Sequence, residues 1–257
     1  MNSSSPEWFL TRPSATYQPA RIFCFAHAGG NPRTFLGWQP SLDGDAEIVA
    51  VCPPGRAHRA SEPQPSLTDY VQGAAAAIAE ATASDARPSY LFGHSLGALV
   101  AFEVARLLNA QTTVGHLVIS ALAAPSLLPS ARVRELAGLQ GKAFAEALVF
   151  FGGMPPEVLV EEELHELLLP AVMADFRMAA EYRYQPGEPL AIAATLVTGT
   201  QDPHVGAEEL RGWRAEFQNP PAERWVEGGH FYFEPEPTAI TSLLGELARA
   251  DQHVEMI

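Results

Sequence analysis

A serine set between glycines could act as a nucleophile in this chain, in the stretch Gly93-His94-Ser95-Leu96-Gly97. A serine hydroxyl is a weak nucleophile at neutral pH, so it needs a neighbouring base and an exposed place on a sharp turn. Glycine at both ends suits such a turn, because a Cβ would crowd a chain that passes from strand to helix within a few residues. The pattern predicts a nucleophile elbow at Ser95, in preference to a structural serine in a glycine turn.

An acid and a base for this serine follow later in the chain. The serine needs a histidine to accept its proton, and the histidine needs a carboxylate to fix its tautomer and stabilise the imidazolium. Chains with such an elbow place first the acid and then the histidine on loops after late strands. Asp202 follows an apolar stretch through Gly199-Thr200-Gln201 and fits the acid, whereas His230 follows Glu227-Gly228-Gly229 and fits the base.

Other histidines fit the role of base less well. His94 adjoins the serine, but neighbouring side chains on a tight turn point apart, so packing is the better interpretation. His204 is only two residues from Asp202, and His27 lies on an early loop. The remaining histidines have the character of surface or cap residues: His58, His116, His165 and His253.

Two backbone N–H groups should stabilise the negative charge that develops on the carbonyl oxygen under attack. One is expected from Leu96, directly after the serine. The other is expected from the loop His27-Ala28-Gly29-Gly30, with Ala28 as the first choice. The alternative interpretation of this loop is a plain turn.

Strand and helix patterns alternate along the chain and would position these residues. The expected strands span residues 21–25, 47–51, 89–92, 117–122, 190–198 and 223–226, and the expected helices 67–83, 96–109 and 208–217. Such alternation indicates an α/β fold with a mostly parallel sheet covered on both faces. A length of 257 residues suits one such domain over residues 1–257.

Residues 125–186 interrupt this alternation with successive helical patterns and are expected to form an inserted helical cap, or lid. Helices are expected over 142–150, 157–169 and 171–184, the last two separated by Pro170. Apolar side chains of the insertion could line an acyl pocket, although such stripes more often form core. The candidates for substrate binding are Phe150, Met154, Met173 and Phe176, and three further apolar residues are Leu148, Phe151 and Met178.

Composition and charge exclude several classes of partner. A net charge of −14 without a basic stripe argues against nucleic acid and against anionic membranes. Residues 1–13 lack the pattern of a signal peptide, and no apolar run is long enough to span a bilayer, so we expect a soluble, cytoplasmic protein. Cys24 and Cys52 are expected to be core residues rather than a disulfide or a metal pair.

Five motifs in order resemble the stand-alone type II thioesterases that serve modular polyketide and nonribosomal peptide synthases. They are Phe25-Ala26-His27-Ala28-Gly29-Gly30, Pro54-Gly55-Arg56, Gly93-His94-Ser95-Leu96-Gly97-Ala98, Gly199-Thr200-Gln201-Asp202 and Gly228-Gly229-His230-Phe231. Asp175-Phe176-Arg177 and Tyr182 also look like that family's cap region. One departure is Leu96, where the family often has methionine, but only the backbone of this residue is needed.

The resemblance implies an α/β-hydrolase fold and the hydrolysis of acyl thioesters on the phosphopantetheine arm of acyl or peptidyl carrier proteins. Such hydrolysis frees arms that are blocked by aberrant acyl groups. The resemblance implies no metal and no bound cofactor, and we expect a monomer. Synthase-fused thioesterase domains often carry their acid after the strand that follows the nucleophile helix, and residues 119–124 contain none, which supports Asp202.

Other functions use the same groups. A small-molecule carboxylesterase or lipase, or a thioesterase that releases a finished product, needs the same three side chains, and a non-enzymatic scaffold would leave them idle. Carrier proteins are usually acidic, so docking to this acidic chain would need a local basic or apolar patch. Arg33, Arg56 and Arg59 are the candidates, against the alternative of ordinary surface arginines.

Overall fold

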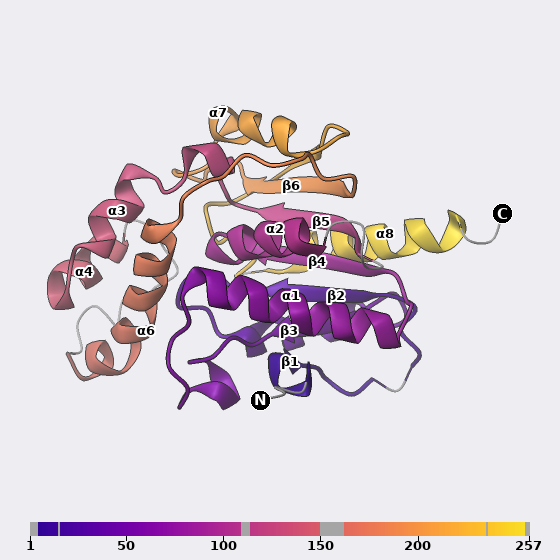
Figure 1. The fold of residues 1–257 in the computed structure, drawn as a ribbon, viewed down its shortest axis with the longest axis horizontal. Helices are drawn as coiled ribbons and strands as arrows, with labels where there is room; N and C mark the ends of the chain where they lie inside the picture. The colour runs from indigo at the N-terminus through magenta and orange to yellow at the C-terminus, as the bar shows by residue number, and fades with distance from the viewer. Residues whose placement is uncertain (1–4, 15, 109–113, 150–161, 235, 255–257) are drawn as a thin grey trace.

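The computed structural model describes residues 5–14, 16–108, 114–149, 162–234 and 236–254, and within these ranges a seven-stranded sheet forms the centre of the molecule (Figure 1). The strand order is β1-β3-β2-β4-β5-β6-β7, and every neighbouring pair is parallel except β1 with β3. The strands are β1 Phe9–Leu10, β2 Arg21–Phe25, β3 Glu47–Val51, β4 Ser89–His94, β5 Val114–Ser120, β6 Ala193–Gly199 and β7 Ala222–Val226. The predicted mostly parallel sheet is confirmed.

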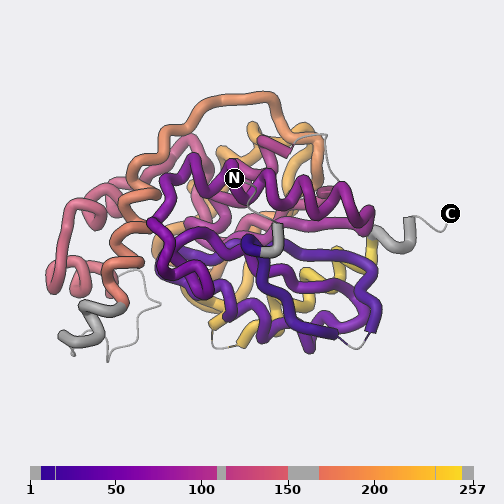
Figure 2. The backbone as a smooth tube through the Cα atoms, turned by 60° about the horizontal axis from the view of Figure 1, so that its bottom comes forward, coloured from indigo at the N-terminus to yellow at the C-terminus, as the bar shows by residue number. Residues whose placement is uncertain are grey.

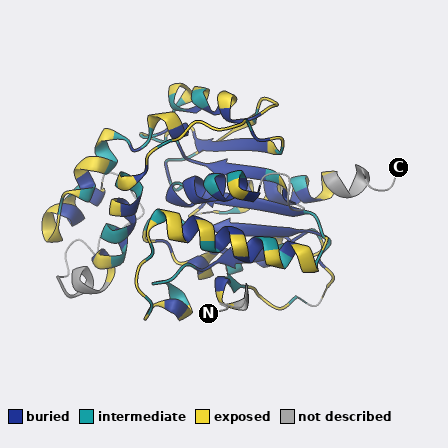
Figure 3. Cartoon of the chain, in the orientation of Figure 1, coloured by how far each residue is buried: buried dark blue, intermediate teal, exposed yellow. Residues whose placement is uncertain are grey.

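Helices cover both faces of this sheet, so most strands are buried while the outer faces of the helices are exposed (Figure 3). α1 (Leu67–Ser84) and α2 (Leu96–Leu108) pack on one face, and η2 (Pro32–Ser41) and α8 (Thr238–Val254) pack on the other. After Arg21, strand β2 is continuously apolar because both of its faces are buried. Phe23 and Phe25 join one core cluster, and Ile22 and Cys24 join the other.

Between β5 and β6, the described residues form the inserted helices α3 (Ala131–Ala137), α4 (Gly141–Leu148) and α6 (Glu162–Glu181). They lie beyond the carboxyl edge of the parallel strands in both views (Figures 1 and 2). They share a buried apolar cluster of their own, formed by Leu136, Phe144, Ala145, Leu148, Leu169, Val172 and Phe176.

The structure corrects the prediction of two helices separated by Pro170, because α6 continues through that proline. A proline inside a helix removes one N–H donor and costs about 3 kcal/mol. Leu169, Val172 and Phe176 are all buried on this helix, and burial of each such side chain contributes about 1.5–3 kcal/mol. The burial therefore offsets the proline.

Smaller differences concern the other elements. The helix expected over 208–217 is a short α7 (Ala207–Leu210) followed by a 3-10 turn, η6 (Arg211–Glu216), and the strand expected over 190–198 is β6. The sequence analysis named neither η2 nor α8. The remaining short turns are η1 Ser5–Trp8, η3 Ala57–Arg59 and η4 Pro125–Leu127. In the described ranges, no helix has both the length and the apolar character that crossing a bilayer requires.

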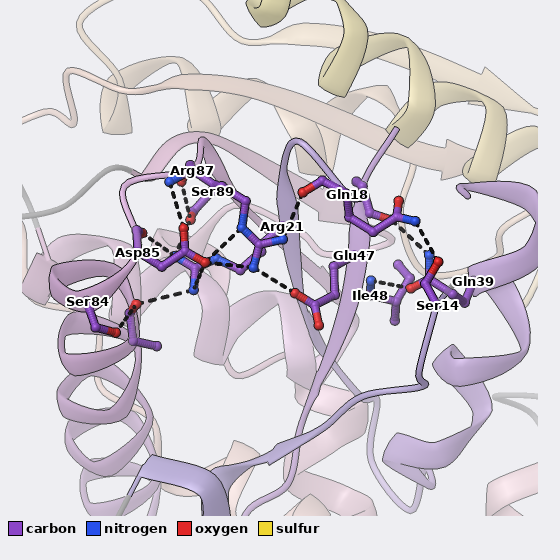
Figure 4. Close-up of polar contacts among 12 residues, drawn as sticks. Ser14, Gln18, Arg21, Gln39, Glu47, Ile48, Ser84, Asp85, Arg87 and Ser89 are labelled. Atoms are coloured by element: carbon purple, nitrogen blue, oxygen red, sulfur yellow. Dashed lines mark hydrogen bonds and ion pairs between the residues drawn. The ribbon is translucent and has the colours of Figure 1, made fainter. Parts of the chain in front are cut away.

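A polar network closes the sheet at the amino ends of β2, β3 and β4 (Figure 4). Arg87 pairs with Glu47 at 3.0 Å and with Asp85 at 2.7 Å, and Arg21 donates to the Asp85 carbonyl at 2.7 Å. Burial is the main cause that lowers the pKa of Arg21 below its ordinary value. This end of the sheet is therefore tied together by charge, and the opposite end carries the candidate site.

Candidate active site

Ser95 lies at the turn between β4 and α2 with a backbone φ of 53°, in the left-handed region. Its N–H donates to the Ser120 carbonyl at 2.9 Å, and its own carbonyl accepts from the Ala98 N–H at 2.9 Å. A Cβ on Gly93 would lie 2.2 Å from the Gly97 carbonyl oxygen, and one on Gly97 would lie 2.1 Å from the Phe25 carbonyl oxygen. Both glycines are therefore required by close backbone approach.

Asp202 and His230 are joined by a hydrogen bond of 2.8 Å between Oδ2 and Nδ1. Asp202 follows β6 and His230 follows β7, so both come from the carboxyl edge of the sheet. The Asp202 side chain is 0% exposed and that of His230 is 7% exposed. The two loops are also joined through their backbones, because the Gln201 N–H donates to the Gly228 carbonyl at 2.8 Å.

The environment of Asp202 favours its ionised form. Burial raises the pKa of this carboxyl, but hydrogen bonds from His230 and from the His204 N–H outweigh burial and hold the pKa below its ordinary value. An ionised carboxylate can only accept a hydrogen bond, so Nδ1 of His230 carries the proton and donates to Asp202. In the neutral ring, Nε2 is then left as an acceptor. A histidine with a free Nε2 lone pair can accept a proton from a hydroxyl.

His94 is buried beneath the elbow and packs rather than titrates. It is 0% exposed, its Nδ1 lies 2.8 Å from Ser120 Oγ, and Ser120 Oγ lies 2.8 Å from the Tyr232 hydroxyl. Burial lowers the pKa of His94 well below its usual value, so the ring is neutral. The ring centroids of His94 and His230 are 5.0 Å apart, so His230 lies beside the residue that precedes Ser95.

Ser120 and Tyr232 were missed by the sequence analysis. A hydroxyl at the last position of an apolar strand is a signal that could have found Ser120, because a polar group placed there faces the carboxyl edge of the sheet. For Tyr232 the only signal is its position two residues after His230.

The loop that carries Ala28 lies beside the elbow. Ala28, Ser95 and Leu96 line one pocket, and the Gly30 N–H donates to the His27 carbonyl at 2.9 Å. Gly29 has a φ of 75°, and its N–H donates to Asp175 Oδ2 of α6 at 2.7 Å. The loop is thus a constrained turn, and its residue Ala28 lines the same pocket as the candidate nucleophile.

A mostly apolar pocket of about 70 Å³ is lined in part by Ser95. Ten residues line it: Ala28, Ser95, Leu96, Leu99, Leu122, Leu128, Pro129, Val133, Phe176 and Ala179. Of the four residues expected to bind substrate, Phe176 lines this pocket, and Met173 packs against the apolar cluster of the inserted helices. Phe150 and Met154 lie outside the described residues.

Two of the three arginines expected to face a partner are engaged inside the protein. The Arg59 side chain is 7% exposed and pairs with Glu62 at 2.7 Å. The Arg56 side chain is 11% exposed and pairs with Asp175 at 2.5 Å. Arg33 is exposed. Within the described part of the chain, no group of three histidine, cysteine, aspartate or glutamate side chains is arranged to hold a metal ion.

Comparisons with known proteins agree with this architecture. A family model described as a thioesterase domain matches residues 20–247. Thioesterase PikA5 from Streptomyces venezuelae is 32% identical over 234 residues, which cover 90% of this chain and 82% of that protein. The structure of the type II thioesterase BorB from the borrelidin biosynthetic cluster has a TM-score of 0.81 and 31% identity, covering 96% of this chain and 100% of that chain.

A second solved structure gives the same result. The thioesterase RedJ from the prodiginine pathway of Streptomyces coelicolor has a TM-score of 0.79 and 30% identity, with 91% of each chain covered. The order of strands and these matches confirm the predicted α/β-hydrolase fold.

Proposed function

Because this chain belongs to the thioesterase family and is a serine hydrolase that acts on thioesters, we propose that it removes acyl groups from carrier proteins. The substrate is an acyl thioester on the phosphopantetheine arm of an acyl or peptidyl carrier protein. Ser95 is the nucleophile, His230 the base and Asp202 the acid that orients it. The enzyme works in the cytoplasm as a monomer and needs no cofactor.

Acylation transfers the acyl group from sulfur to Ser95. His230 Nε2 accepts the hydroxyl proton while Oγ attacks the thioester carbonyl carbon, and the N–H groups of Ala28 and Leu96 stabilise the resulting oxyanion. The tetrahedral intermediate collapses, the C–S bond breaks, and the imidazolium returns its proton to the departing thiolate. A thiolate leaves more readily than an amine, so this step needs less help than peptide cleavage.

Deacylation repeats the same chemistry with water. His230 removes a proton from a water molecule as its oxygen attacks the acyl carbon, and the same two N–H groups stabilise the second oxyanion. Collapse breaks the bond to Ser95 Oγ, which regains its proton from His230, and the free carboxylic acid departs.

Residues 125–186 act as a cap over this site within a single domain of residues 1–257. The pocket beside Ser95 is small, with a volume of about 70 Å³. A pocket of this size suits a short acyl group better than a finished product, which favours editing over product release. Phe176 supports the acyl group directly, and Phe150, Met154 and Met173 belong to the same proposed acyl-binding region.

The observation that carries this proposal is the arrangement around the elbow. Ser95 lines an apolar pocket, and His230, which is paired with Asp202, lies against His94, the residue before Ser95. The names of similar proteins support the pathway class, since BorB and RedJ are thioesterases from biosynthetic clusters.

Mass spectrometry of a short-chain acyl carrier protein incubated with the enzyme tests this proposal. We expect the wild-type protein to remove the acyl mass and Ser95→Ala to leave it in place. A trapped acyl mass on Ser95 during turnover would support the covalent step. Acyl loss that does not depend on Ser95 would refute the proposed mechanism. A higher kcat/KM on the matched oxygen ester of pantetheine than on its thioester would favour a carboxylesterase instead.

A further inference from the structure

A carboxylate of the inserted helices contacts the loop that carries the proposed oxyanion donor. Asp175 on α6 is 7% exposed, and its Oδ2 accepts the Gly29 N–H at 2.7 Å. The two residues are 146 positions apart in the chain. The hydrogen bond of the Gly29 N–H is therefore made to a side chain of the insertion and not within the loop itself.

A second contact, one helical turn away, reinforces the first. A Cβ built on Gly29 would lie 2.6 Å from Cγ2 of Val172, so α6 packs directly against the backbone of the loop. Ala28 also packs against the apolar cluster of the inserted helices. Since Val172 and Asp175 are three residues apart, they lie on one face of α6 and meet the loop together.

Arg56 pairs with the buried carboxylate and holds it in place. Its Nη2 lies 2.5 Å from Asp175 Oδ2 and donates to the Ala171 carbonyl at 3.1 Å, and its Nη1 donates to the Gly55 carbonyl at 3.1 Å. Burial raises the pKa of Asp175, and the charge of Arg56 and the hydrogen bond from Gly29 oppose that shift. A buried carboxylate needs such partners.

The peptide between Ala28 and Gly29 is planar, so fixing the direction of the Gly29 N–H also fixes ψ of Ala28. Only the Ala28 Cα then separates this fixed plane from the peptide whose N–H serves the oxyanion. Donors must point accurately at the developing charge, because losing one costs about 100-fold to 1,000-fold in kcat. Anything that holds this peptide therefore holds the oxyanion donor.

We propose that Asp175 is a positioning residue that couples the seating of α6 to the oxyanion hole through the Gly29 N–H. This inference rests on the proposed function of Ala28 as an oxyanion donor. Asp175 does not act as a base, because its carboxylate is occupied by Gly29 and Arg56. Its neighbour Phe176 lines the acyl pocket, so an acyl group that seats α6 also supports the geometry for attack.

Asp175→Ala and Asp175→Asn test the proposal with a short-chain acyl-pantetheine thioester. For Asp175→Ala we expect kcat to fall by about 10-fold to 100-fold, with KM changed less than about 3-fold. Asp175→Asn keeps an oxygen that accepts the Gly29 N–H, so it should recover most of the lost kcat. A short alkyl boronic acid forms a tetrahedral adduct on Ser95 that resembles the oxyanion. Its affinity for Asp175→Ala should fall by the same factor as kcat/KM.

Leu169→Ala is the matched control, since Leu169 is a buried residue of the same helix and cluster and lies six positions before Asp175. It should lower Tm at least as much as Asp175→Ala while leaving boronic acid affinity within about 3-fold. The proposal is overturned if boronic acid affinity and kcat follow Tm across all three variants, or if Asp175→Asn behaves as Asp175→Ala. A wild-type protein that does not turn over thioesters would refute the proposed function instead.

Discussion

At the scale of single residues, the site depends on backbone positions that tolerate one residue type. Ser95 has a positive φ, which costs a non-glycine residue about 1–3 kcal/mol, and its backbone hydrogen bonds with Ser120, Ala98 and Leu99 hold it there. Gly93 and Gly97 make that strain possible, because backbone atoms occupy the space where their Cβ atoms would lie. The elbow is thus stabilised by close packing of backbone against backbone.

Gly97→Ala should disable the elbow. The added Cβ would lie 2.1 Å from the carbonyl oxygen of Phe25, which cannot rotate away, so β2 and α2 must separate. A displacement of about 1 Å at reacting groups costs about 100-fold, so we expect kcat/KM to fall by about 100-fold or more. The measurement is turnover of an acyl-pantetheine thioester, with fluorophosphonate labelling of Ser95 as a second readout.

The matched control is Gly115→Ala, where a Cβ would meet nothing within 4 Å. It should keep kcat/KM within about 3-fold of the wild type. Equal activity of Gly97→Ala and Gly115→Ala would show that the close approach at Gly97 is not needed for the chemistry.

His94 should make the protein sensitive to acid. Burial depresses its pKa in the folded state, whereas an unfolded histidine has a pKa of about 6.5. Unfolding therefore takes up a proton below that pH, and the stability that neutral His94 contributes is present above pH 6.5 and lost as the pH falls further. Chemical denaturation from pH 7.5 to 4.5 should show a shallower loss of unfolding free energy for His94→Gln than for the wild type.

His58→Gln is the control for this pH series, since it replaces an exposed histidine. Parallel curves for His94→Gln and the wild type would contradict the assignment of the acid sensitivity to His94.

Ser95, Asp202 and His230 could be nominated from the sequence because each stands in a local pattern next to a strand end. The contact of Asp175 with Gly29 and the hydrogen bonds of Ser120 could not. The Asp175 contact joins residues 146 positions apart, and the bond from Ser120 to Tyr232 joins residues 112 apart. Such contacts depend on the register of helices and strands, which no short motif encodes.

At the scale of elements, the inserted helices supply part of the lining of the pocket beside Ser95. The sequence predicted a helical insertion but divided α6 at Pro170, because a proline is a strong local signal and the burial that offsets it is tertiary. The same limit applies to the pocket, whose lining comes from α2, the segment around Pro129, and α6. Its volume follows from how these elements pack.

Leu99→Ala should enlarge the acyl pocket. Leu99 is 2% exposed on α2 and lines the pocket beside Ser95, so truncation adds room for further carbon atoms. We expect the ratio of kcat/KM for hexanoyl-pantetheine over acetyl-pantetheine to rise about 10-fold, because each added methylene is worth about 0.8 kcal/mol where it can be buried. Stability should fall by about 2–5 kcal/mol.

Leu244→Ala controls for the loss of stability, since Leu244 is 1% exposed on α8 in the core cluster on the other face of the sheet. It should lower stability similarly and leave the chain-length ratio unchanged. A rise in the ratio for both variants would attribute the change to general loosening, and an unchanged ratio for Leu99→Ala would remove this residue from the acyl pocket.

At the scale of the whole molecule, charge would govern the proposed encounter with a carrier protein. The chain carries a net charge of −14, and Arg56 and Arg59 are buried and paired with Asp175 and Glu62 rather than facing solvent. Arg33 is the exposed member of the three arginines considered for docking. If the substrate is an acidic carrier protein, as proposed, the net charge of this chain would repel it over long distances, and close apolar contact would have to provide the affinity.

This repulsion predicts that kcat/KM for a carrier substrate rises with ionic strength, whereas electrostatically steered association would make it fall. Raising ionic strength from about 0.01 to 0.15 M shortens the Debye length from about 30 to 8 Å, so the repulsion between two acidic proteins is screened. We expect kcat/KM for a short-chain acyl carrier protein to rise several-fold over this range. For the same acyl group on pantetheine, which has no such charge, kcat/KM should change less than about 2-fold, which separates encounter from chemistry.

A fall in kcat/KM with salt for the carrier substrate alone would mean that a local basic patch steers docking despite the net charge. Arg33→Ala would then be expected to abolish that fall.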